Sequence, residues 1–128
     1  MKKLLSVFLI FTCILVFSSC TAKEEDVLHL GVNAIITAID PEEKILTVKD
    51  FSEGDTFGEE SFLLCKDAEL IYCNYDSLEV RDISFEDLQV GDAVILNIYE
   101  AELSKLKSPD SNKTVKVQQV QLGTQRLN

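Results

Sequence analysis

The stretch that decides the fold is GVNAIITAIDPEEKILTV, residues 31–48. Its apolar residues alternate in two runs, the pattern of β-strands that bury one face. The first run places Ile35 and Ile39 on one face and the other apolar residues on the opposite face: Val32, Ala34, Ile36 and Ala38. Asp40-Pro41 begins the turn, because proline fixes φ at the second turn position. The stretch therefore predicts a hairpin of strands 29–40 and 44–49.

Further strand-like segments follow the hairpin and are separated by short polar turns. Residues 61–66 and 69–75 come first, and residues 66–68 either separate them or bend them as one strand. Residues 77–83 could add a short strand, and 93–103 and 114–122 are the last two segments. One helical turn is expected after Ser84, because Asp87 completes a capping box and Gly91-Asp92 ends the turn. In the last segment the apolar residues change parity at Gln118-Gln119. A β-bulge there would keep them facing inward, and fraying of the strand is the alternative.

These elements predict an all-β fold, a small five-stranded OB-like partly open barrel with one short helical turn, preceded by a signal peptide helix. A β-sandwich of another type is the alternative. The expected organisation is a lipoprotein signal peptide at 1–19, a lipidated cysteine and tether at 20–27, the barrel at 28–124 and a C-terminal tail at 125–128.

The N-terminus has the pattern of a secretion signal. Lys2 and Lys3 precede an apolar run of about 14 residues, and Ser18-Ser19 supplies small residues for cleavage. The run is shorter than the roughly 20 residues that a transmembrane helix needs. A cleaved signal is therefore favoured over a permanent membrane-spanning anchor.

The end of this signal, Phe17-Ser18-Ser19-Cys20, resembles the lipobox of bacterial lipoproteins. The resemblance implies cleavage before Cys20 and attachment of diacylglycerol to its thiol. Two acyl chains hold a protein stably on a membrane, whereas one chain does not. We therefore expect a lipid-anchored protein on the extracytoplasmic face of the cell membrane. An ordinary cleavage site nearby, for example after Ala22, is the alternative.

The mature chain is strongly acidic. Residues 1–19 contain two basic residues and no acidic one, so 10 basic and 22 acidic residues remain, a formal charge of −12. This charge disfavours nucleic acid, whose binding depends on neutralised phosphates. It also disfavours direct adhesion to anionic lipids.

Two cysteines, Cys65 and Cys73, remain in the expected domain. On one straight strand they would lie about 26 Å apart, whereas a disulfide needs Cα atoms about 4.4–6.8 Å apart. A disulfide therefore requires a chain reversal near residues 66–68. The alternative is a pair of buried thiols that behave as small apolar residues.

The chain carries little that points to an enzyme. Its single histidine, His29, stands at the start of the first strand with no catalytic motif around it. No G-x-S-x-G, H-E-x-x-H or phosphate-binding glycine loop occurs in the sequence. We expect no catalytic residues and no cofactor.

An acidic loop follows the hairpin. It contains five carboxylates that together could bind a divalent cation: Asp50, Glu53, Asp55, Glu59 and Glu60. The order of an EF-hand is absent, so a solvated loop is the simpler interpretation. Phe51 and Phe57 in this loop are candidates for lining a ligand-binding face.

Three segments resemble the YobA-like group of small bacterial lipoproteins with an OB-like domain: GVNAIITAIDPEEKILTV, DAELIY (67–72) and FEDLQVGDAVIL (85–96). The resemblance implies that fold and brings no catalytic residue. The leading hypothesis is a non-enzymatic lipoprotein that binds a protein, peptide or glycan at the membrane. A cation-binding module using residues 50–60 is the second hypothesis, and an extracytoplasmic enzyme is the third.

Overall fold

The computed structural model describes residues 26–127 except 53 and 109–110. These residues form a mainly β fold, which confirms the predicted class. The strands are β1 (Leu28–Asp40), β2 (Ile45–Asp50), β3 (Ser61–Leu64), β4 (Glu69–Cys73), β5 (Val80–Asp82), β6 (Ala93–Tyr99), β7 (Thr114–Lys116) and β8 (Gln119–Leu122). Two short helical elements complete the described part, a 3₁₀ turn η1 (Phe85–Asp87) and the helix α2 (Glu100–Lys105).

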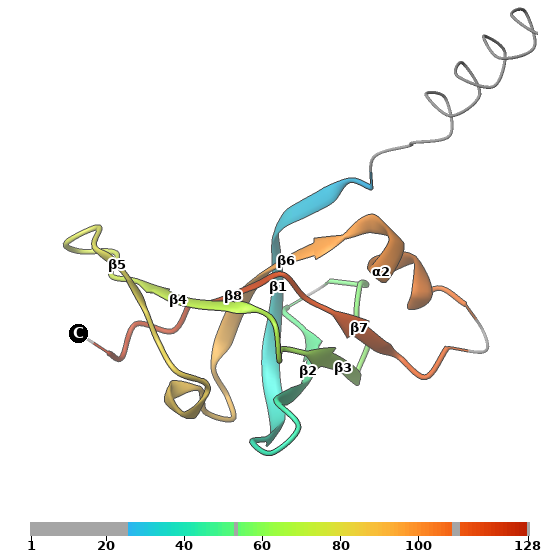
Figure 1. Ribbon diagram of the computed structural model, residues 1–128, viewed down its shortest axis with the longest axis horizontal. Coiled ribbons are helices and arrows are strands. Elements are labelled where there is room, and N and C mark those ends of the chain that lie inside the picture. The colour runs from blue at the N-terminus through green and yellow to red at the C-terminus, as the bar shows by residue number, and fades with distance from the viewer. Residues whose placement is uncertain (1–25, 53, 109–110, 128) are drawn as a thin grey trace, which may run out of the picture.

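The strands form one mixed sheet in the order β5-β4-β8-β6-β1-β2-β3-β7, so the described chain has eight strands where five were predicted. The long strand β1 runs through the middle of the molecule (Figure 1) and pairs antiparallel with β2 and with β6. Two pairs are parallel, β3 with β7 and β4 with β8. In the described residues no helix has the length and apolarity needed to cross a bilayer.

The β1–β2 hairpin forms as predicted. Its turn is held by the Asp40 carboxylate, which accepts the amides of Glu42 and Glu43 at 3.1 and 3.2 Å. The pairing shifts between Ile36 and Ala38, which marks a β-bulge. Ala38 is consequently exposed, contrary to the predicted alternation, while Ile39 packs against the core.

The predicted strand 93–103 is wrong in its second half. Strand β6 ends at Tyr99 and the chain turns into α2. Tyr99, the N-cap residue of α2, makes no side-chain hydrogen bond that caps this helix. The cap is supplied by Asp26, just before β1, whose carboxylate accepts the Ala101 amide at 3.1 Å. The Val27 carbonyl likewise accepts the Glu100 amide at 2.7 Å.

The predicted last strand divides in two. Strand β7 pairs with β3, and β8 lies between β4 and β6. The apolar residues change parity at Gln118 because the chain changes its pairing partner there, not because of a simple bulge or fraying. The four apolar side chains of this segment are therefore all buried: Val115, Val117, Val120 and Leu122.

The short helical turn is confirmed. The Asp87 carboxylate accepts the Ser84 amide at 2.9 Å, as in a capping box. Gly91, with φ of 95°, then turns the chain into β6. Residues after β8 return to this turn, where Arg126 binds the Asp92 carboxylate.

Candidate binding site

A hollow of about 420 Å³ lies between the start of β1, the loop after β2, and α2 with the connection that follows it. This volume falls within the range of about 300–1,000 Å³ typical of ligand sites. The lining residues are His29, Asp55, Thr56, Phe57, Gly58, Glu100, Leu103, Leu106, Lys107 and Lys113. The hollow thus joins segments that are far apart in the sequence.

The floor of the hollow is apolar and its rim is charged. Phe57 and Leu106 are only 2% and 6% exposed, and Leu103 packs against the same core. Acidic and basic side chains both reach the rim, and the Lys113 ammonium is fixed there by donating to the Leu106 carbonyl at 3.1 Å. Such a surface suits a ligand that has both apolar and charged parts.

His29 faces this hollow. In the β1–β6 register it pairs with Ile98, which is fully buried, so its ring turns toward the inner side of the sheet. Nε2 of His29 contacts the carboxylate of Glu100, the first residue of α2, and both side chains stay more than 40% exposed. The sequence placed His29 only at the start of the domain and did not identify this partner. In the described chain no serine or cysteine hydrogen-bonds to the ring.

The acidic loop is organised by Asp50. One carboxylate oxygen of Asp50 accepts the amides of Thr56 and Phe57 at 3.0 and 2.7 Å, and the other accepts the Gly58 amide at 2.8 Å. The Phe57 carbonyl accepts the buried Ser61 hydroxyl at 2.6 Å. These bonds hold Phe57 in the floor of the hollow. The sequence signal for this loop arrangement was an aspartate followed by a glycine-rich turn, because Asp side chains often accept backbone amides within turns.

The five predicted cation ligands do not share one position. Asp55 lines the hollow, whereas Asp50 and Glu59 line a second depression beside Lys49. Glu60 is exposed, and Glu53 lies outside the described residues. Within the described ranges, no three His, Cys, Asp or Glu side chains are grouped as metal ligands.

Both domain cysteines are free thiols. Cys65 belongs to the core, and its burial raises the pKa of the thiol to about 12. Cys73 ends β4 and is partly exposed. Cys65 follows β3, which pairs with β7, and Cys73 ends β4, which pairs with β8. The positions opposite the two cysteines are about six residues apart in sequence, roughly 20 Å of extended chain. A disulfide cannot span that distance. Of the two alternatives, a disulfide or a pair of thiols, the structure therefore contains the pair of thiols.

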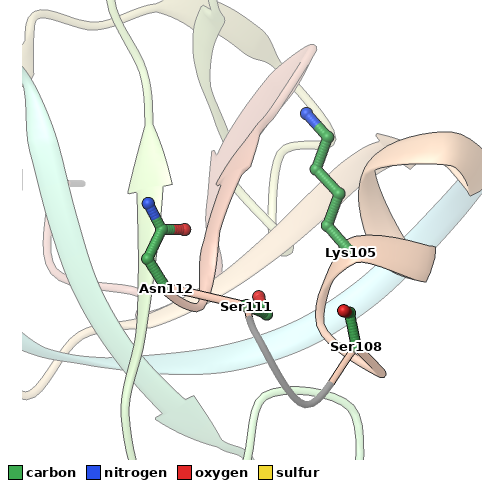
Figure 2. Close-up of a pocket in the computed structure, with 4 residues that line it drawn as sticks. All are labelled: Lys105, Ser108, Ser111 and Asn112. Carbon is green, nitrogen blue, oxygen red and sulfur yellow. The ribbon is translucent and has the colours of Figure 1, made fainter.

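A third depression of about 340 Å³ lies beside the end of α2 (Figure 2). It is lined by polar side chains: Lys105, Ser108, Ser111 and Asn112. Figure 2 shows Lys105 at the end of α2, with Ser108, Ser111 and Asn112 around the same depression. This depression lacks the buried apolar floor of the hollow beside His29.

The predicted lipid-attachment residue Cys20 and the cleavage-site residues before it, Phe17, Ser18 and Ser19, also lie outside the described residues. The hollow begins a short way further along the chain, at His29. No protein-family model, curated protein sequence or solved structure matches this chain, so its function has to be argued from the site itself.

Proposed function

We propose that this chain is a membrane-anchored lipoprotein whose β domain binds a partner without performing chemistry on it. The position of the hollow carries the proposal. His29 and Glu100 line it, and the Glu100 amide is bonded to Val27, only seven residues after the proposed lipidated Cys20. A ligand in the hollow would therefore be held close to the membrane.

A peptide segment of a basic partner protein fits this hollow best. The mature chain carries a formal charge of −12, which attracts a cationic partner and speeds its association. The apolar floor accommodates a side chain, and on the rim Asp55 can pair with a basic group of the peptide while Lys107 can pair with an acidic one. Phe57 is 2% exposed, so it offers no open aromatic face for stacking on a sugar. A peptide is thus favoured over a glycan.

We further infer that the sheet is an OB-like barrel. In this interpretation β3 and β4 are halves of one strand, β7 and β8 are halves of another, and β5 is an addition. The strand pairings support this interpretation. Strand β1 pairs with β2 and β6, β7 pairs with β3, and β8 pairs with β6. OB-fold domains bind ligands with the loop before their last strand. Residues 100–113 occupy that place and supply half of the lining residues of the hollow, and the analogy with the YobA-like group agrees.

Site-specific photocrosslinking of the full-length chain in membranes tests the proposal. A photoreactive residue at position 107, on the rim, should yield a defined adduct. The same residue at exposed Lys66, which lies in a different depression, is the matched control. The adduct at position 107 should disappear in the double variant Asp55→Ala, Glu100→Ala. Equal adducts from both positions would remove the hollow as the binding site.

A further inference from the structure

The outer surface at the start of β1 is apolar and uncovered. Leu30 is 71% exposed, Val27 60%, Phe51 48% and Leu28 37%. We call three of these residues, Leu28, Leu30 and Phe51, the N-terminal apolar face, and Val27 directly precedes β1. The described residues include other exposed apolar side chains, among them Leu78 and Val90, which belong to other loops.

The strand register shows that this face is separate from the hollow. His29 pairs with buried Ile98 and turns inward, so Leu28 and Leu30 on either side of it turn outward. Phe51 directly follows Asp50, the last residue of β2, and its side chain is 48% exposed, so it too lies outside the core. In Figure 1 the start of β1 projects from the body of the domain.

We propose that the N-terminal apolar face rests on the bilayer that carries the lipid anchor. This inference depends on the proposed lipidation of Cys20. Val27 is seven residues from Cys20, so it lies at most about 25 Å away along an extended chain. A flexible chain of this length spans about 15 Å on average. The anchor therefore keeps the face within reach of the lipid surface.

Tethering makes a weak contact sufficient. A group held by a short flexible linker has an effective concentration in the millimolar range, so a contact too weak to recruit the free protein is populated in the anchored one. The charges near the face are mixed. Asp26 and the acidic loop around Phe51 disfavour an anionic lipid surface. Exposed Lys49 pairs with Ile35, next to buried Ala34, so it points to the outer face and can meet the phosphate of a zwitterionic lipid. The hollow, on the other side of β1, stays open to a partner.

The chain contains no tryptophan, so one introduced residue reports on its own surroundings. The test compares Leu30→Trp with Leu78→Trp, which is a matched control because Leu78 is 76% exposed and lies in the β4–β5 hairpin. Each lipidated protein is placed in phosphatidylcholine vesicles containing brominated phosphatidylcholine. Tryptophan at position 30 should emit at shorter wavelength and be quenched several-fold more than tryptophan at position 78.

Each result decides the question. Equal quenching at both positions, or none at either in a protein whose mass shows the lipid, would overturn the docking face while leaving the anchor intact. A mass without lipid would overturn the proposed function and this inference together. Quenching at position 30 that appears only above a threshold protein density would instead indicate a second copy on the face. The Cys20→Ala form should show no quenching, and thermal unfolding of each variant should match that of the parent.

Discussion

The guanidinium of Arg126 binds the carboxylate of Asp92 through two hydrogen bonds, Nε to Oδ1 at 3.0 Å and Nη2 to Oδ2 at 2.6 Å. The Asp92 side chain is 5% exposed and the Arg126 side chain 24%. The same carboxylate also accepts the Gln89 amide at 2.8 Å. This pair fastens the C-terminal segment to the turn that leads into β6.

Replacing Arg126 with Ala should destabilise the domain. Asp92 would remain buried with one donor, and the loss of hydrogen bonds to a charged group costs about 1–3 kcal/mol. For a domain of this size the melting temperature should fall by about 4–8 °C per kcal/mol. Thermal unfolding followed by circular dichroism measures it, with Lys66→Ala as an exposed control. An unchanged melting temperature would show that the pair does not contribute to stability.

Replacing Asp50 with Ala should loosen the loop that forms one wall of the hollow. Three amide donors, those of Thr56, Phe57 and Gly58, lose their acceptor, at a combined cost of about 1–3 kcal/mol. Asp55→Ala is the matched control, since Asp55 carries the same charge in the same loop and accepts none of these bonds. Amide hydrogen exchange should accelerate at residues 56–58 only in the Asp50 variant. Equal exchange in the two variants would contradict this role.

Calcium should leave the melting temperature of the protein unchanged. Both carboxylate oxygens of Asp50 already accept amides, and no group of three potential metal ligands occurs in the described part of the chain. A ligand that binds only the folded state raises its stability by mass action. A clear rise at millimolar calcium, lost in Asp55→Ala, would therefore favour the cation-binding module.

The two domain thiols should differ in reactivity. The thiolate is the reactive form, and burial holds the pKa of Cys65 at about 12, so this thiol stays protonated at pH 8. Iodoacetamide should modify Cys73 in the native protein and reach Cys65 only after denaturation. Peptide mass spectrometry without reductant gives the result. Two unmodified cysteines after denaturation would mean that they are bonded to each other.

Replacing Cys20 with Ala should abolish membrane retention of the mature protein. Without the acceptor thiol, the chain should appear as unprocessed precursor or be released, because stable anchoring requires two acyl chains. Fractionation with immunoblotting measures this, and Cys13→Ala is a control within the signal. Membrane retention of Cys20→Ala at mature size would disprove lipid anchoring.

Local signals predicted much of the fold. The Asp40-Pro41 turn and the Ser84 and Asp87 capping box each depend on neighbours in the sequence. Helix α2 was missed because its cap, Asp26, is 75 residues from the amide it accepts. The alternation through Leu96 and Ile98 meanwhile continued to resemble a strand. The division of the predicted last strand, residues 114–122, into β7 and β8 was also missed, because the two strands follow each other directly and differ only in the strands they pair with.

The candidate site was harder to predict than the fold. His29 and Asp55 were both singled out in the sequence, but nothing local indicates that they line one hollow. Their proximity depends on the β1–β6 register and on the Asp50 bonds that fold the loop. In the sequence, Lys107 and Lys113 appear only as members of a polar loop. Residues brought together by long-range pairing leave no periodic signal, which is why the pattern of the chain did not reveal them.

The parallel pairing of β3 with β7 joins Phe62 to Thr114. The sheet therefore cannot be completed until the last part of the chain is available, and its formation requires the closure of a long loop. Proteins dominated by such non-local contacts fold slowly, in about milliseconds to seconds. A chain of this topology therefore cannot complete its sheet while its last residues are still being made, and its strands β3 and β4 lack their parallel partners until then.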